Sequence, residues 1–270
     1  MRHAQTFGNF VVAVAVFALV SGCARKPDRR ARIVASTTLI ATITEQVGGG
    51  RFAVTTIAPA GLCPGHFDIK PSDILAANQA QLLLNHGWEA WFPKLEQALV
   101  KPGPRKVTLK TQGNWMVPPV QVAATREIAA LLGSVDAANA RLYLERADVV
   151  VAQVESAGAV AHGLFANQSL PAVIAADKQK PFLEWLGFRV LASYGRPEEF
   201  TAQELTRLAR VIVDSGVGLI VDNLQSGPDA GRSLAEAAGI KQVTLSNFPL
   251  EGSYSKTLMS NADTLAKLVR

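Results

Sequence analysis

A cysteine and a histidine three residues apart have the clearest potential for chemistry in this chain. Cys63 and His66 lie in the segment Gly61–Asp73, and Pro64 and Gly65 between them predict a tight turn. A stiff loop fixes nitrogen and sulfur donors before an ion arrives, and such donors suit transition metals. We therefore predict that Cys63 and His66 bind a metal. The alternative for Cys63 is a buried, inert thiol.

A carboxylate at the end of an apolar segment is a further candidate. Asp222 follows the run Gly218–Val221, which is typical of a buried strand. Polar residues beyond the carboxyl ends of strands collect where α/β proteins bind ligands. The sequence has no Gly-x-Ser-x-Gly elbow, no Gly-Lys-Ser/Thr phosphate loop and no His-Glu-x-x-His pair. We therefore expect a binding protein and not an enzyme.

The first residues predict export and attachment to a membrane. Arg2 precedes an uncharged apolar run over 10–20, too short for a comfortable membrane span, and Val20-Ser21-Gly22-Cys23 follows. This ending resembles the lipobox of bacterial lipoproteins, which implies a signal peptide over 1–22 and lipidation of Cys23. Cys63 would then be the only free thiol of the mature chain, without an intramolecular disulfide.

Basic residues cluster directly behind the expected anchor. Removal of residues 1–22 takes away one Arg and no acid, so 26 basic and 22 acidic residues leave a charge of +4. The basic side chains of Arg25, Lys26, Arg29, Arg30 and Arg32 predict a tether over 23–31 near anionic lipid headgroups. We find no face that mixes basic and aromatic residues, so we expect no nucleic-acid partner.

Short β-branched runs alternate with helical patterns along the rest of the chain. Continuous apolar strands of this kind predict an α/β fold with parallel sheets covered by helices. The expected strands cover 33–36, 53–57, 81–84, 106–109, 172–175, 189–192, 218–221 and 242–245.

The middle of the chain lacks strand signals. A helix is expected over 120–132, ended by Gly133, and a second helical pattern runs from an N-cap at Asp136 to about residue 166. We therefore expect two α/β lobes joined by one long rigid helix, with a ligand cleft between the lobes. The expected boundaries are 32–133 for the N-terminal lobe, 134–167 for the connecting helix and 168–270 for the C-terminal lobe.

The sequence resembles the solute-binding proteins of zinc and manganese ABC transporters. Gly65–Asp73 is similar to the family's Pro-His-x-Tyr-Glu-x-x-Pro-Ser-Asp segment, and Asn85–Leu95 is similar to its Asn-Gly-x-x-x-Glu-x-Trp-x-x-Lys-Leu segment. The resemblance implies that His66 is the first metal ligand. It also implies transport of a metal to a membrane permease, without a catalytic step.

The other ligand segments of the family differ in this chain. Where the family has its second histidine, this chain reads Gly113-Asn114-Trp115-Met116-Val117. In the segment where the family has its third histidine, this chain has Gln179. The carboxylate segment reads Leu245-Ser246-Asn247-Phe248. Met116, Gln179 and Asn247 are therefore candidates that the resemblance adds, with core packing, cleft lining and a surface turn as their respective alternatives.

These observations lead us to expect a monomeric, lipid-anchored metal receptor in the cell envelope, facing the periplasm or the outer surface. Zinc is the expected cargo, held by Cys63, His66 and oxygen donors, and manganese is possible. A site of Cys63, His66 and Met116 would suit copper, since thiolate and thioether donors favour it. The alternatives are another solute, such as a metal chelate, and an adhesion or scaffold lipoprotein on the same fold.

Overall fold

A computed structural model of the chain describes residues 30–250 and 252–269. The predicted signal peptide, Cys23 and most of the tether lie outside the described residues. Residues 31–270 form one compact unit. Within the described part, no helix combines the length and the hydrophobicity that crossing a lipid bilayer requires.

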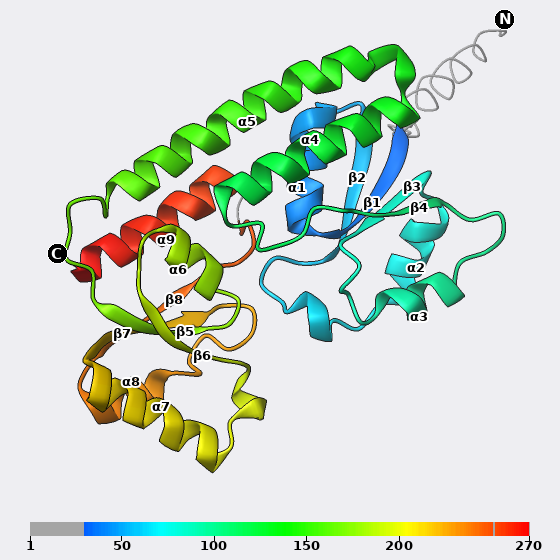
Figure 1. The fold of residues 1–270 in the computed structure, drawn as a ribbon. Coiled ribbons are helices and arrows are strands. Elements are labelled where there is room, and N and C mark those ends of the chain that lie inside the picture. The colour runs from blue at the N-terminus through cyan, green and yellow to red at the C-terminus, as the bar shows by residue number, and fades with distance from the viewer. Residues whose placement is uncertain (1–29, 251, 270) are drawn as a thin grey trace, which may run out of the picture. The chain divides into compact units, whose positions relative to one another are not determined.

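Two four-stranded parallel sheets form the framework (Figure 1). The first sheet has the order β2-β1-β3-β4, with β1 (Ala31–Thr37), β2 (Phe52–Ala58), β3 (Leu82–Asn85) and β4 (Arg105–Thr108). The second has the order β6-β5-β7-β8, with β5 (Ala172–Ala176), β6 (Val190–Tyr194), β7 (Val217–Asn223) and β8 (Lys241–Leu245). All eight predicted strands are present, and both sheets have the same strand order.

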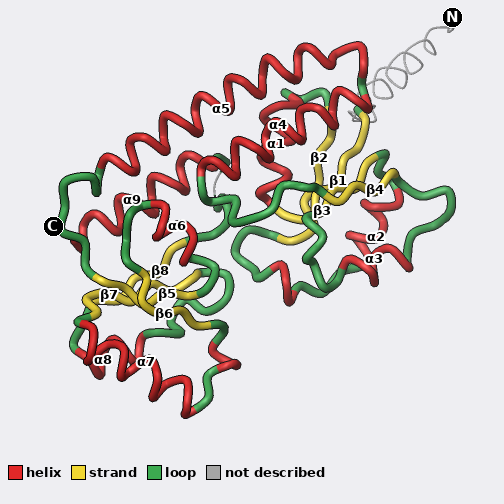
Figure 2. The backbone as a smooth tube through the Cα atoms, viewed as in Figure 1, coloured by secondary structure: helices red, strands yellow, loops and turns green. Residues whose placement is uncertain are grey.

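Helices cover both faces of each sheet (Figure 2). They are α1 (Thr38–Gly48), α2 (Pro71–Asn78), α3 (Phe92–Gln97), α6 (Lys180–Trp185), α7 (Ala202–Ser215), α8 (Arg232–Ala238) and α9 (Tyr254–Val269), besides α4 (Pro118–Val135) and α5 (Ala140–Gly163). Short 3-10 turns occur at η1 (Pro64–His66), η2 (Ala137–Asn139) and η3 (Pro197–Glu199). The predicted α/β class is confirmed.

Successive strand residues face opposite layers, as the two-residue period of a strand requires. In β1, Ile33 and Ala35 face a large central core, whereas Val34 faces a smaller cluster that includes Trp91. The central core contains buried residues of both sheets and of the helices between them: Ile33, Leu84, Val173, Val221, Leu132 of α4, Val154 of α5 and Leu258 of α9. One continuous apolar layer therefore joins the two halves.

The connection between the sheets is a pair of helices, of which α5 is the long one. Helix α4 does not end at Gly133 but continues to Val135, and α5 begins at Ala140 instead of at residue 136. Asp136 lies between them, and its carboxylate accepts hydrogen bonds from Asn139 Nδ2 at 2.8 Å and Tyr143 OH at 2.5 Å. The expected N-cap is thus displaced, because these bonds hold a 3-10 turn before the long helix starts.

Candidate functional site

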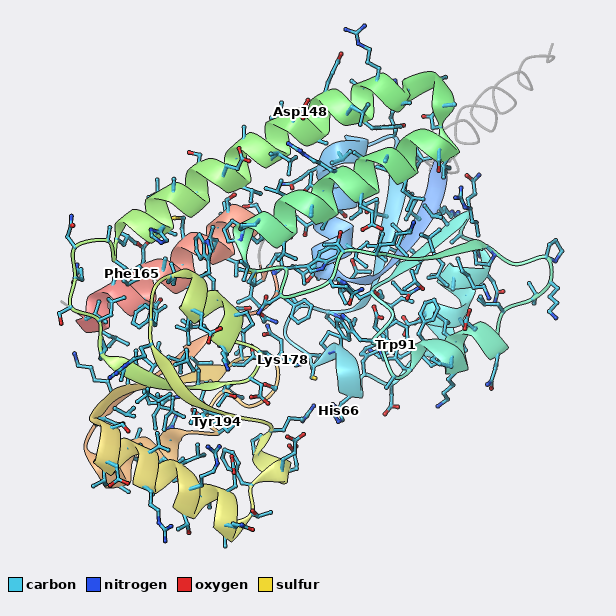
Figure 3. All side chains as sticks on the ribbon, in the orientation of Figure 1. His66, Trp91, Asp148, Phe165, Lys178 and Tyr194 are labelled. Atoms are coloured by element: carbon cyan, nitrogen blue, oxygen red, sulfur yellow. The ribbon has the colours of Figure 1, made fainter. Side chains whose placement is uncertain are left out.

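A cavity of about 660 Å³ lies at the carboxyl ends of the strands. Figure 3 labels three of its lining residues, His66, Lys178 and Tyr194. Segments that follow the strands of both sheets line it, which is where α/β sheets bind ligands. From the first half these include Leu39, Cys63, His66, His86, Trp88, Asn114 and Trp115. From the second half they include Asp177, Lys178, Arg196, Glu199, Asn223, Gln225, Ser226, Asn247 and Phe248.

The predicted turn at Cys63 is present as η1, in the loop between β2 and α2. The His66 backbone N–H donates to the Cys63 carbonyl at 3.1 Å, and Trp91 Nε1 donates to the Pro64 carbonyl at 2.7 Å. The buried Phe67 ring packs edge-on against Trp91, with centroids 5.8 Å apart. The turn is therefore fixed to the core while Cys63 Sγ and His66 Nδ1 lie 3.7 Å apart at the cavity.

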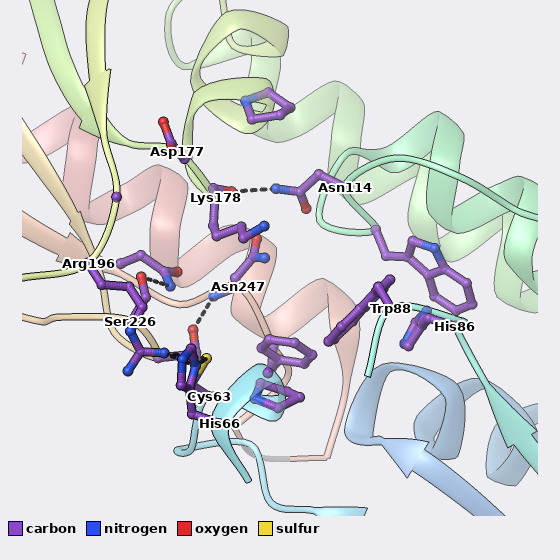
Figure 4. A pocket seen from close by; sticks show the side chains of 18 of the residues that line it. Cys63, His66, His86, Trp88, Asn114, Asp177, Lys178, Arg196, Ser226 and Asn247 are labelled. Carbon is purple, nitrogen blue, oxygen red and sulfur yellow. Dashed lines mark hydrogen bonds between the residues drawn. The ribbon is translucent and has the colours of Figure 1, made fainter. Parts of the chain in front are cut away.

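Arg196 crosses the cavity from the other half and contacts both of these side chains (Figure 4). Its Nη1 donates to Cys63 Sγ at 3.2 Å and also to His66 Nδ1. A guanidinium carries only N–H donors, so His66 Nδ1 can only accept in this contact. The guanidinium thus occupies the position between the sulfur and nitrogen donors.

His86 also lines the cavity, but it is buried and part of the framework. Its Nε2 lies 2.8 Å from Thr37 Oγ1, and its ring stacks on Trp88 with centroids 5.0 Å apart. Burial lowers the pKa of His86 to about 4, against a smaller opposing effect of the nearby Glu89 carboxylate. This agrees with the structural role that a histidine beside a strand end suggests.

Asn247 joins Cys63 and His66 at the cavity. Its backbone N–H donates to Gln225 Oε1 at 2.9 Å, which fixes the loop after β8. Its side-chain Oδ1 is buried and has no hydrogen-bond partner among the described residues. An unpaired buried carbonyl oxygen is costly unless a ligand satisfies it. Asn247 can therefore supply an oxygen to a bound solute.

The other three candidates do not line the cavity. Met116 is fully buried in the central core, where its carbonyl accepts from Tyr254 OH at 2.8 Å and its backbone N–H donates to Asn114 Oδ1 at 2.8 Å. Gln179 is fully buried, and its Nε2 donates to Asn223 Oδ1 at 2.9 Å and to the Leu245 carbonyl at 3.1 Å. Gln179 Oε1, like Asn247 Oδ1, is buried without a hydrogen-bond partner among the described residues. Neither Met116 nor Gln179 lines the cavity, so the ligand role expected for them stays a prediction.

Asp222 is likewise a structural carboxylate. It accepts hydrogen bonds from Tyr194 OH and from the Gly231 backbone N–H at 2.9 Å, and Gln242 Nε2 donates to its second oxygen. Burial raises the pKa of Asp222, and these hydrogen bonds oppose that shift. Its oxygens are therefore engaged inside the second half and are not directed at a cavity ligand.

Two basic residues of the cavity were not anticipated from the sequence. Lys178 follows β5 and Arg196 follows β6, so both stand at strand ends, like Asp222. The signal that could have found them is the same strand-end rule that selected Asp222. Within the described residues, no group of three or more His, Cys, Asp or Glu side chains is arranged to hold a metal ion.

Several known proteins are similar to this chain. The manganese ABC transporter substrate-binding lipoprotein PsaA of Streptococcus anginosus is 32% identical over 95 residues, which cover 32% of this chain and 31% of that protein. The matched part thus spans about a third of this curated relative.

Solved structures have the same fold. A crystal structure of ZnuA has a TM-score of 0.77 at 17% identity and covers 89% of this chain and 100% of that chain. FpvC of Pseudomonas aeruginosa in complex with Ni²⁺ has a TM-score of 0.76 at 17% identity, covering 89% and 97%. At these identities the comparison concerns the fold alone.

The family assignment rests on a match along almost the whole described chain. The family model described as zinc-uptake complex component A, periplasmic, matches residues 33–268, which include both sheets, the connecting helices and every cavity residue. The two-sheet fold agrees with the resemblance that the Gly65–Asp73 segment suggested. The chain belongs to this family of metal ABC transporter solute-binding proteins, which are not enzymes.

Proposed function

We propose that this protein captures a transition-metal species in the cavity and delivers it to the permease of an ABC importer. The observation that carries the proposal is the pair of Cys63 and His66, held on a rigid turn at the carboxyl ends of the strands. The printed functions of the relatives, which include manganese transport for PsaA, support the same reading.

Zinc is the metal that we propose first. Sulfur and nitrogen donors suit zinc and copper, whereas manganese prefers carboxylate and carbonyl oxygens. Cys63 and His66 supply the first kind of donor, and the Asn247 carbonyl supplies one oxygen. Manganese stays an equal alternative on the names of the relatives. Copper rests on the thiolate alone, since Met116 does not line the cavity.

Attachment to the membrane completes the proposal. Lipidation of Cys23, together with the basic residues behind it, would hold the protein beside its permease in the cell envelope. Replacement of Cys23 by Ser is expected to abolish lipid labelling and to release the protein from membranes. Unchanged membrane association of this variant would contradict the anchor.

Metal binding is tested by elemental analysis and thermal unfolding of the protein purified without affinity metals. A ligand that binds only the folded state stabilises it by RT ln(1 + [L]/Kd), about 2.7 kcal/mol at a hundredfold excess over Kd. Zinc should raise the melting temperature and magnesium should not. His66→Ala should remove the response, whereas His162→Ala, an exposed position on α5 outside the cavity, should keep it. An equal response to all divalent ions would contradict a defined site.

A further inference from the structure

The point that a bare metal ion would share between Cys63 and His66 already holds a cation. Arg196 Nη1 contacts both Cys63 Sγ and His66 Nδ1, the two atoms that face each other across 3.7 Å. A guanidinium keeps its charge at all physiological pH values. A dication that enters this position must therefore displace Arg196 or remain beside a fixed positive charge, which repels it.

Arg196 is built into this position. It follows β6 immediately, and the Arg196 backbone N–H donates to Glu199 Oε2 at 3.2 Å as η3 begins. Its Nε lies 3.4 Å from Glu198 Oε2, and the Arg196 side chain is only 21% exposed. The turn and the neighbouring carboxylate thus direct the Nη1 end of the guanidinium across the cavity.

The remainder of the cavity suits an organic anion better than a lone ion. About 660 Å³ falls in the range of small-molecule sites, which are a few hundred to a thousand Å³. Lys178 lines the same space, and none of the ion pairs among the described residues includes it. Ser226 Oγ accepts from Asn223 Nδ2 at 2.8 Å, so its hydroxyl hydrogen is free to donate to a ligand.

The acidic residues that line the cavity do not neutralise the positive charges that favour an organic anion. The Glu199 carboxylate accepts a hydrogen bond from the Arg196 backbone N–H. The Asp177 side chain points away from Cys63 and His66 in Figure 4. The described part of the chain also lacks a cluster of three His, Cys, Asp or Glu donors. The protein therefore offers too few ligands to complete a metal shell and offers cations where the missing ligands would have to be.

We infer that the cargo brings its own anionic ligands: it is a transition-metal ion chelated by a small polycarboxylate. Cys63 or His66 contacts the metal, and Arg196 pairs with a carboxylate of the chelator, with Lys178 as a second cation. Arg196 is thus the residue that determines specificity for the chelate over the bare ion. The inference rests on the proposed function, because it defines the substrate class of the same site.

The effect of citrate on zinc retention tests this inference directly. If the site takes the bare ion, citrate competes for zinc and weakens retention by the full-length protein in detergent. If the site takes the chelate, citrate strengthens retention, and radiolabelled citrate stays with the protein only when zinc is present. The same measurement with manganese covers the second candidate metal, and citrate alone shows whether the anion binds without metal.

Substitution of Arg196 separates specificity from metal binding. Charge-assisted hydrogen bonds contribute enough that Arg196→Gln should weaken retention of zinc citrate by about tenfold or more. The same variant should bind free zinc at least as well as the wild type, because Cys63 and His66 are released. Arg210→Gln is the matched control, since Arg210 is exposed on α7 and does not line the cavity. Melting temperatures without ligand confirm that both variants fold.

The outcomes separate the two proposals. Opposite effects of Arg196→Gln on zinc citrate and free zinc support the inference. Zinc retention that citrate weakens, with no labelled citrate bound and no effect of Arg196→Gln, overturns the inference and leaves the proposed function standing. Citrate that binds equally with and without metal also overturns it. Retention of neither zinc nor manganese in any form overturns both.

Discussion

Cys63 is half-buried at the cavity, with its sulfur facing a nitrogen donor and a guanidinium. If the thiolate contacts the metal, cobalt substituted into the site should show a sulfur-to-metal charge-transfer band in the near ultraviolet. Cys63→Ser should remove the band and weaken cobalt binding, because an alcohol is a poor ligand for this ion. Cys63→Ala serves as the control for packing and should leave the metal-free protein nearly as stable. Tight cobalt binding without the band would exclude Cys63 and favour Asn247.

Asp222, unlike Cys63, is expected to stabilise the fold and not to bind the metal, and this can also be tested. Asp222→Ala removes the acceptor of the Gly231 N–H and leaves the buried Tyr194 OH with only the Val221 carbonyl, at 3.3 Å. We expect the free energy of unfolding to fall by about 2–4 kcal/mol, measured by urea denaturation. Asp229→Ala removes an exposed carboxylate of the same segment and should cost little. Loss of metal retention without loss of stability would show instead that Asp222 reaches the cargo.

For single residues, the sequence predicts the metal-binding side chains better than it predicts what surrounds them. Cys63 and His66 could be found because both lie in one turn, which local sequence determines. Arg196 could not be paired with them, since 130 residues separate it from His66 and only the tertiary fold brings the two together. Met116 could not be placed from the sequence, because a thioether suits both a metal and an apolar core, and in the structure it lies in the core.

The carboxyl ends of β1 and β3 are joined by a buried polar network beside the cavity. The Glu89 carboxylate accepts hydrogen bonds from the Ser36 hydroxyl and from the backbone N–H groups of His86 and Gly87, the latter two at 2.9 Å. The His86 ring lies against Thr37 of β1 and packs edge-on against Trp115, with centroids 4.5 Å apart. The network therefore holds the cavity wall of the first half in place.

This network makes the stability of the protein depend on pH. The folded pKa of His86, about 4, lies below the unfolded value of 6.5, so the unfolded chain takes up the proton first. The contribution of neutral His86 to stability is complete above pH 6.5 and is lost as the pH falls toward 4, by roughly 3 kcal/mol at most. Urea denaturation at several pH values should show this decline.

Two histidine variants isolate the origin of that decline. His86→Gln should flatten the decrease between pH 6.5 and 4, since the side chain that titrates is gone. His162→Gln should leave it unchanged, because His162 is exposed on α5. A His86→Gln curve parallel to that of the wild type would assign the pH dependence to other groups.

Among the elements, strands were more predictable than helix ends. All eight strands were identified, most clearly β3 and β5, whose residues are buried throughout, whereas β4 at a sheet edge is mostly exposed. The boundary between α4 and α5 was harder to predict. Gly133 was expected to end the first helix, but α4 continues past it. An added Cβ at Gly133 would lie 3.1 Å from Ala140 Cβ. This glycine is therefore explained by the close approach of the two helices, a tertiary feature.

At the scale of the whole molecule, the two sheets share one apolar core. The central core is one apolar layer in which α5 contacts both α1 of the first half and α9 of the second. The sequence suggested two α/β lobes with a long helix between them, and the two parallel sheets and helix α5 agree with that fold, while buried residues of both sheets belong to one core. Such sharing of a core couples the stabilities of the two halves.

We therefore expect the two halves to unfold in a single cooperative transition. In a Trp185→Phe variant, the tryptophans that remain, Trp88, Trp91 and Trp115, all lie in the first half, so tryptophan fluorescence reports unfolding of that half. Far-ultraviolet circular dichroism reports unfolding of both halves. The urea midpoints from the two signals should coincide. Val154→Ala, at the centre of the shared core, should lower both midpoints together, with a loss of about 1–3 kcal/mol. Separate midpoints, or a shift of only one of them, would mean that the halves fold independently and that closure of the cavity is a motion between two autonomous lobes.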